Sequence, residues 1–148
     1  MAVIMVSACL LGCSCRYDGK NCKNDAVLSL AQDNVLVGIC PEQMGGLPTP
    51  RDPAEICGGK VVSKSGRDVT SEYTKGARTA LQLALLNGAK YAVLKSKSPS
   101  CGKGIIYDGT FSGGKVGGNG VSAELFMQDG IDVFTEEELD RLADILKK

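Results

Sequence analysis

Three cysteines occur at or just beyond the ends of predicted β-strands. Cys9 follows the run MAVIMVSA, Cys40 follows NVLVGI, and Cys101 follows YAVLKS after a short polar loop. In an open α/β sheet, the carboxyl ends of parallel strands line one edge, and ligands bind in the crevice there. Three thiols that are far apart in sequence are therefore predicted to meet at one point. Three thiolates suit a metal or an iron–sulfur cluster, and they leave one coordination position open for chemistry.

The donor types in the chain narrow this chemistry. The 148 residues include no histidine, which removes imidazole as a metal ligand and as the usual general base. Zinc sites usually draw their ligands in close pairs, whereas each of these cysteines comes from a separate loop. An all-thiolate set is more typical of an iron–sulfur cluster or a soft metal. The alternative is that the three residues are buried structural cysteines, which are common.

Three further cysteines, Cys13, Cys15 and Cys22, crowd the loop that follows the first strand. Either Cys13 or Cys15 could supply a fourth ligand or guard the site. Alternatively, these thiols are extras on the solvent side of the loop. The seventh cysteine, Cys57, has no role that the sequence suggests.

Polar residues beside the three cysteines are candidates for acid–base and hydrogen-bonding roles. Glu42 lies two residues after Cys40, where a metal site and burial would tune its carboxyl as an acid or base. Ser98 and Ser100 precede Cys101, and their hydroxyls could bond to a cluster sulfide or a substrate. Alternatively, Glu42 is an ordinary surface residue, and Ser98 and Ser100 are simply turn residues. Four cationic side chains lie nearby in the sequence: Arg16, Arg51, Lys95 and Lys97. They could bind an anionic group, or they could simply be solvated surface charges.

Composition excludes several classes of partner. Hydrophobic residues make up 43% of the chain and the formal net charge is zero, as in an ordinary globular protein. No basic excess exists to hold a nucleic acid polymer, and no apolar run is long enough to span a membrane. Seven cysteines, an odd number, make a poor disulfide framework, and no charged n-region of a signal peptide precedes Cys9. We therefore predict a cytoplasmic protein with reduced thiols.

The alternation of apolar runs and amphipathic stretches predicts an α/β fold. We expect a single domain over residues 1–148, a Rossmann-like sandwich with a mostly parallel sheet. A capping box of Thr135 and Glu138 is predicted to begin the last helix. The expected strands cover 2–7, 34–39, 91–96 and 131–134, and the expected helices cover 25–32, 70–86, 121–129 and 135–148.

Three connecting segments are expected to lack long regular structure. Residues 40–55 contain four prolines and two adjacent glycines, too broken for a helix, and so form a long loop. Residues 58–70 predict a hairpin that turns at Ser65–Gly66. The glycine-rich loop Gly109–Gly120 nearly matches a phosphate-binding loop, but Val116 stands where Ser or Thr is needed, so we reject an NTPase. That loop could still present backbone amides to an anion, or act as a mobile lid.

Several sequence blocks together resemble a known family. SACLLG with CSCRYDG, CPEQMGGLPTPRDPAE, KSPSCG and YDGTFSGGKVGGNGVSAELF are similar to signature blocks of the bacterial 2-thiouracil desulfurase family. The blocks occur in the right order along nearly the whole chain, which makes the resemblance specific.

The resemblance implies a [4Fe–4S] cluster with one open iron, held by Cys9, Cys40 and Cys101. It also implies a catalytic glutamate, matched by Glu42, and a serine near the cluster, matched best by Ser98 and next by Ser100. The expected reaction is redox-neutral: water activated by Glu42 replaces the sulfur of a small thiolated compound, and sulfide is released. The substrate class would be a thiopyrimidine, either a thiouracil base or a thiouridine nucleotide.

Two non-catalytic alternatives stay open from the sequence: a zinc–thiol protein, and an iron–sulfur protein for electron transfer or sensing. An open site is exposed to oxygen, so we expect an aerobically purified sample to lack the cluster. We expect a monomer or a small homo-oligomer.

Overall fold

A four-stranded parallel sheet forms the centre of the protein. The computed structural model describes residues 1–147. The strand order is β2–β1–β5–β8, and all three pairings are parallel, which confirms the predicted α/β sheet. The four strands are β1 (Val3–Ser7), β2 (Val35–Ile39), β5 (Tyr91–Leu94) and β8 (Asp132–Thr135).

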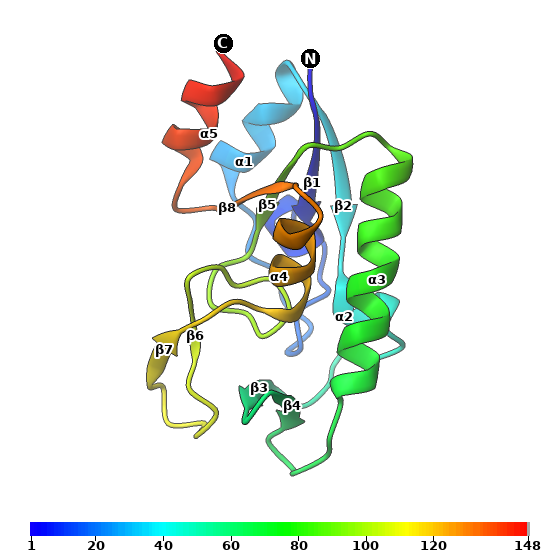
Figure 1. Cartoon of the computed structure of the whole chain (residues 1–148), viewed down its shortest axis with the longest axis vertical. Coiled ribbons are helices and arrows are strands. Elements are labelled where there is room, and N and C mark those ends of the chain that lie inside the picture. The colour runs from blue at the N-terminus through cyan, green and yellow to red at the C-terminus, as the bar shows by residue number, and fades with distance from the viewer. Residues whose placement is uncertain (148) are drawn as a thin grey trace.

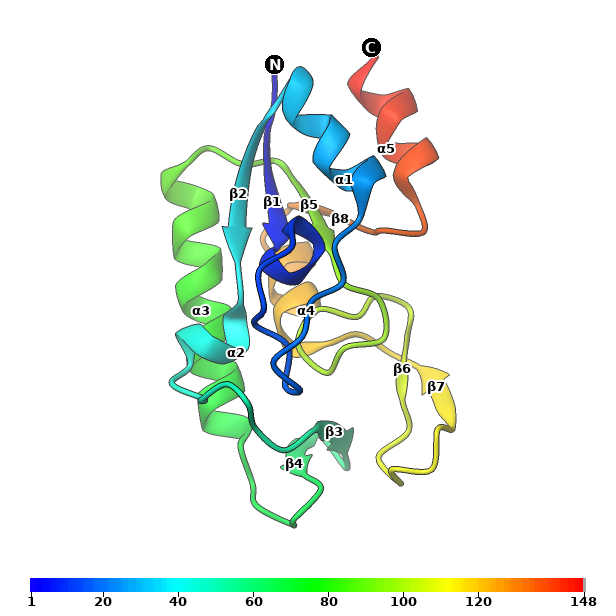
Figure 2. The same ribbon diagram turned by 180° about the vertical axis from the view of Figure 1, so that it is seen from behind.

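Helices cover both faces of this sheet (Figures 1 and 2). One face packs against α3 (Thr70–Leu86) and α4 (Val121–Gln128), and the other against α1 (Asp25–Ser29) and α5 (Leu139–Leu146). The central strand β1 serves both layers, because Met5 packs with α3 and α4 whereas Ile4 and Val6 pack with α1 and α5. A strand buried on both faces reads as a continuous apolar run, which explains why it was predictable.

Two expected helices have somewhat different boundaries. Asn24 caps α1 as predicted, by accepting a hydrogen bond from the Val27 N–H at 3.1 Å, and the helix continues as the 3₁₀ turn η2 (Leu30–Gln32). The last helix begins at Leu139 rather than at 135. The Glu138 carboxylate does accept a bond from the Thr135 N–H at 3.1 Å, so half of the capping box forms, one turn before the helix. Lys148 lies outside the described residues.

The prediction that residues 40–55 contain no helix is wrong, since α2 covers Pro41–Met44. Proline is tolerated at the first position of a helix because that N–H needs no partner there. Helix α2 packs against α3 through two glycines, Gly45 and Gly76. A Cβ on either glycine would collide with the backbone of the other helix, so only glycine allows this approach.

Two hairpins lie beyond the carboxyl edge of the sheet. Strands β3 (Ala54–Cys57) and β4 (Lys60–Ser63) turn at Gly58 and Gly59, which have φ of 58° and 79°. The turn expected at Ser65–Gly66 forms a second loop, closed by a single bridge between Val62 and Asp68. Strands β6 (Ile105–Tyr107) and β7 (Lys115–Gly117) form the other hairpin.

The expectation of a loop throughout 109–120 is therefore wrong at residues 115–117. The exposed strand KVG carries no alternation of apolar and polar residues, so periodicity could not reveal it. Within residues 1–147, no helix has the length and apolar character that a bilayer crossing requires.

Candidate functional site

A cavity of about 440 Å³ opens at the carboxyl edge of the sheet. Its walls come from segments that follow β1, β2 and β5 and from parts of both hairpins. Cys9, Cys40 and Cys101 all line this cavity, so the topology brings together the three cysteines that the strand ends had singled out.

Each of these cysteines is placed by a different local structure. Cys9 lies in the 3₁₀ turn η1 (Ala8–Leu11), and its carbonyl accepts a bond from the Cys22 N–H at 2.9 Å. Cys40 is the N-cap residue of α2. Cys101 lies in the loop between β5 and β6, where its N–H donates to the Ser98 hydroxyl at 3.0 Å. Backbone bonds near each thiol thus hold the three side chains around the cavity.

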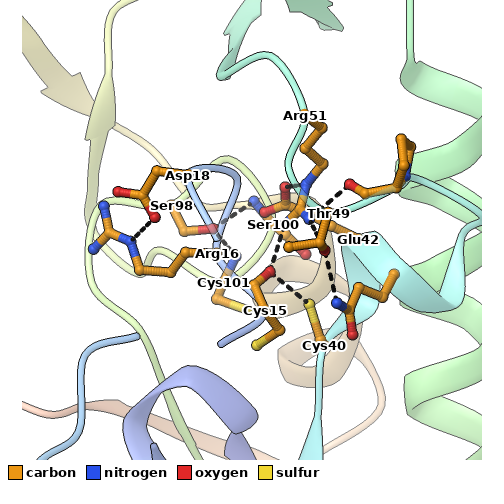
Figure 3. Close-up of polar contacts among 12 residues, drawn as sticks. Cys15, Arg16, Asp18, Cys40, Glu42, Thr49, Arg51, Ser98, Ser100 and Cys101 are labelled. Carbon is orange, nitrogen blue, oxygen red and sulfur yellow. Dashed lines mark hydrogen bonds and ion pairs between the residues drawn. The ribbon is translucent and has the colours of Figure 1, made fainter. Parts of the chain in front are cut away.

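Cys15 adds a fourth thiol to the cavity wall. It is 6% exposed, and its carbonyl accepts bonds from the Cys40 thiol at 3.7 Å and from Arg51 Nη2 at 2.9 Å (Figure 3). Cys13, in contrast, is exposed, and Cys22 accepts a bond from Arg16 Nη1 at 2.7 Å. Of the three cysteines that crowd the first loop, Cys15 is the one that the fold turns toward the site.

The surroundings of Cys15, Cys40 and Cys101 raise the pKa of each thiol and so favour its protonated form. Burial raises the pKa of Cys101 to about 12. The contact with Cys40 lowers the pKa of Cys15, but the Cys9 thiol and burial outweigh it and raise that pKa to about 11. The contact with Cys15, followed by burial, raises the pKa of Cys40 well above its ordinary value. A metal that binds these sulfurs would therefore displace protons.

The arrangement of the cavity thiols limits the kind of metal centre that they could bind. Among residues 1–147, no three Cys, Asp or Glu side chains converge closely enough to hold a single metal ion. An iron–sulfur cluster spreads its thiolates over different irons and so tolerates wider spacing. The all-thiol donor set around one cavity fits a cluster.

Glu42, the predicted acid–base residue, lines the same cavity from the first turn of α2. Its Oε1 accepts a bond from Arg51 Nε at 3.0 Å, in an ion pair whose side chains are 6% exposed at Arg51 and 17% exposed at Glu42 (Figure 3). Arg51 also donates to the carbonyl of Cys15, so one guanidinium ties the carboxylate to the cysteine loop.

Tyr73 is a cavity residue that the sequence did not suggest. It comes from the first turn of α3 and is 2% exposed. Burial, with the nearby Glu42 carboxylate, raises the pKa of Tyr73 above its ordinary value, so the hydroxyl stays neutral. In a sequence, a single tyrosine on a helix face cannot be told apart from an ordinary core residue. Only its contact with the cavity marks Tyr73 as part of the site.

The two candidate serines have different environments. Ser98 lines the cavity, and its Oγ accepts bonds from the N–H groups of Ser100 and Cys101, both at 3.0 Å. Ser100 is 1% exposed, and its hydroxyl pairs with that of Ser122 on α4 at 2.9 Å. The structure places Ser98 on the cavity wall and Ser100 behind it, where Ser100 contacts Cys101.

The four candidate cations all line the cavity, and each has an acidic or sulfur partner. Lys95 Nζ donates to Glu136 at 2.9 Å, and Lys97 approaches Glu137 at 3.9 Å. Arg51 pairs with Glu42, and Arg16 with Cys22 and Asp18.

Open α/β proteins with a parallel sheet bind ligands or cofactors in the crevice beyond the carboxyl ends of their strands. The fold and the thiol-lined cavity place this protein in that class. Within this class, the chain belongs to the 2-thiouracil desulfurase family, whose model matches residues 4–138. The resemblance carried by the sequence blocks is thereby confirmed.

Two relatives are similar along almost the entire chain. The uncharacterized protein YbbK of Bacillus subtilis (strain 168) is 45% identical, in an alignment that covers 93% of this chain and 98% of YbbK. The solved structure of the [4Fe-4S]-dependent thiouracil desulfidase TudS aligns with a TM-score of 0.94 at 46% identity and covers 99% of each chain.

Proposed function

We propose that the protein removes sulfur from a small thiolated pyrimidine and replaces it with oxygen. The reaction is a hydrolysis: the C=S group and water give a C=O group and hydrogen sulfide, with no net oxidation or reduction. The observation that carries the proposal is that the thiols of Cys9, Cys40 and Cys101 and the Glu42 carboxyl line one cavity. The fold around it matches the desulfidase TudS, with a TM-score of 0.94.

In this proposal, Cys9, Cys40 and Cys101 hold a [4Fe–4S] cluster. When bound, the cluster supplies a soft, Lewis-acidic iron with affinity for a thiocarbonyl sulfur. Glu42 takes a proton from the water that adds to the thiocarbonyl carbon and returns one to the departing sulfur. Arg51 holds one oxygen of Glu42, which fixes the direction of the carboxylate.

Ser98 orients the substrate in this scheme. Its oxygen is already used as an acceptor by two backbone N–H groups, so its hydrogen is the part that a substrate oxygen or sulfur can meet. The cavity of about 440 Å³ is of the size that holds a small ligand. Free thiols at all seven cysteines suit a reducing cytoplasm as the place of action.

The test is sulfide release by anaerobically reconstituted protein, with loss of the thiocarbonyl absorbance, over a panel of thiolated bases and nucleotides. Glu42→Gln should keep the iron content and lose kcat by about 100-fold or more, because a positioned proton-transfer group is removed. The matched control, Glu137→Gln, alters an exposed glutamate outside the cavity and should leave kcat unchanged. A reconstituted protein that releases no sulfide from any compound would favour an electron-transfer or sensing role.

A further inference from the structure

One wall of the cavity comes from the loop that joins β6 and β7. Phe111 and Gly113 of this loop, together with Tyr107 at the end of β6, line the cavity. The loop lies far in sequence from Cys9 and Cys40, and Figures 1 and 2 show the β6–β7 hairpin extending beyond the carboxyl edge of the sheet. A wall built from such a remote segment is available to contact a substrate.

Phe111 has an unusual backbone and an unusual position for a phenylalanine. Its φ is +56°, in the left-handed region that bulky residues avoid. In residues 1–147 only one other non-glycine residue, Lys97 with φ of +66°, has a positive φ, and it also lines the cavity. The two lie on connected segments, since Lys97 forms a β-bridge with Ile106. Strained backbone that gathers at one cavity points to function there.

The packing of Phe111 also sets it apart. Phe126 and Phe134 belong to the buried clusters on the two faces of the sheet, whereas Phe111 is in none of the core clusters that the described residues form. Tyr17 and Tyr107, which also line the cavity, have Arg16 and Lys115 over their rings. Phe111 is thus an apolar aromatic residue of the cavity wall that the core does not use.

A buried carboxylate holds this loop in place. Glu55 on β3 is 9% exposed, and its Oε1 accepts bonds from the N–H groups of Gly109 at 3.0 Å and Phe111 at 3.2 Å. No lysine or arginine pairs with Glu55 in the described part of the chain. The backbone amides of the glycine-rich loop therefore bind an anion that the protein itself supplies. A buried carboxylate that accepts hydrogen bonds from two N–H groups of one turn holds that turn in place.

We propose that Phe111 stacks on the planar ring of the substrate, and that Glu55 is the positioning residue that holds Phe111 there. The inference rests on the proposed function for the identity of the ring, a thiolated pyrimidine. Stacking requires a flat π-face on the substrate, so this wall selects cyclic, unsaturated thiocarbonyl compounds over aliphatic ones.

The test compares two pairs of variants by isothermal titration of reconstituted protein with 2-thiouracil and with uracil, which lacks the sulfur. Phe111→Ala should weaken binding of both compounds by about 5- to 150-fold, as expected for the loss of one aromatic stack, and Phe111→Tyr should retain it. Glu55→Ala should weaken binding similarly, whereas Glu55→Gln should retain it, because an amide oxygen can accept both N–H groups. Val116→Ala, at a 49% exposed position of the same hairpin, is the control and should bind as wild type.

A double variant separates positioning from a direct role. If Glu55 acts through Phe111, Glu55→Ala combined with Phe111→Ala should bind no more weakly than Phe111→Ala alone. In sulfide-release assays the Phe111→Ala variant should raise KM far more than it lowers kcat, and its iron content should match wild type.

The outcomes distinguish this inference from the proposed function. Unchanged binding in Phe111→Ala, or additive losses in the double variant, would overturn the inference while sulfide release still supported the function. Ring binding that depends on Phe111 without sulfide release would support the inference and overturn the function. A wild-type protein that binds neither compound would overturn the stacking role.

Discussion

At the scale of single residues, the cavity holds more thiols than a three-ligand cluster needs. Cys9, Cys40, Cys101 and Cys15 all line it, whereas Cys13 and Cys57 are exposed elsewhere. The proposed ligand set leaves out Cys15, whose thiol lies beside those of Cys9 and Cys40. The ligand set can therefore be decided one residue at a time.

A series of Cys→Ser variants tests it. After anaerobic reconstitution, variants of Cys9, Cys40 and Cys101 should each lose the brown colour and most of the iron, because each removes one of only three thiolates. Variants of Cys13 and Cys57 are matched controls that should keep about four irons, the content of a [4Fe–4S] cluster. Cys15→Ser should also keep its iron. If Cys15→Ser lost its iron while the variant of Cys9, Cys40 or Cys101 kept it, Cys15 would be a ligand in place of that residue.

At the scale of elements, the contact between α2 and α3 determines where Cys40 and Glu42 lie. Cys40 is the N-cap residue of the short helix α2 and Glu42 lies in its first turn, and α2 packs on α3 through Gly45 and Gly76. The approach is so close that the Cβ of an alanine would meet backbone atoms, which cannot rotate away as a flexible side chain can. The two glycines are therefore part of the support of the site.

Gly76→Ala should lower the free energy of unfolding. Alanine favours an isolated helix by about 1 kcal/mol over glycine, but forced overpacking against backbone costs about 1–3 kcal/mol, so we expect net destabilisation. Urea denaturation monitored by circular dichroism measures it. Gln82→Ala, at an exposed position of the same helix, should change stability by less than about 0.5 kcal/mol. A Gly76→Ala variant more stable than wild type would contradict the close contact.

The loop after β5, which carries Ser98 and Cys101, is tied to the segment after β8 by Glu136. This carboxylate accepts bonds from Lys95 Nζ at 2.9 Å, the Ser96 N–H at 2.8 Å and the Ser96 hydroxyl at 3.0 Å. Burial raises the pKa of Glu136, but these bonds and the Lys95 charge outweigh burial, so its pKa lies below the ordinary value.

The lowered pKa of Glu136 predicts a pH dependence of stability. A carboxyl whose folded pKa lies below its unfolded pKa stabilises the fold above the unfolded value, near 4.5, and loses this contribution as pH falls through the folded pKa. Glu136→Gln should therefore cost about 1–3 kcal/mol at pH 7 and progressively less below pH 4.5. Thermal unfolding across this range measures it. The control is Glu137→Gln, whose side chain is 63% exposed, and an equal effect of both variants would contradict the prediction.

At the scale of the whole molecule, the cavity gathers segments that follow three strands of one sheet. A cofactor bound to Cys9, Cys40 and Cys101 would cross-link these segments in the native state and not in the unfolded chain. Ligands that bind only the native state stabilise it by mass action.

Removal of the iron should accordingly lower the thermal stability of the entire protein. Anaerobic chelation of reconstituted protein is expected to lower Tm by roughly 5–10 °C, measured by differential scanning calorimetry. Cys101→Ser, which is expected to hold no cluster, should show no chelator-dependent shift. An equal shift in that variant would show that the iron is bound elsewhere.

The sequence alone was sufficient to predict the four strands of the parallel sheet, the long helix α3 and the meeting of Cys9, Cys40 and Cys101. Buried parallel strands are continuous apolar runs, and the carboxyl ends of parallel strands share one edge, so local pattern and topology determine these features. The sequence also placed Glu42 near Cys40, because residues only two positions apart stay close in space however the chain packs.

Only the tertiary structure decided which other residues join the site. Cys15 rather than Cys13 faces the cavity, Arg51 holds Glu42, and Glu55 holds the loop of Phe111. These partners come from separate loops and hairpins whose residues follow no periodic pattern. Their selection depends on how distant backbone segments pack, as between Gly45 and Gly76, and on where a buried carboxylate finds N–H donors. Such contacts are properties of the folded chain, and the order of its residues does not reveal them.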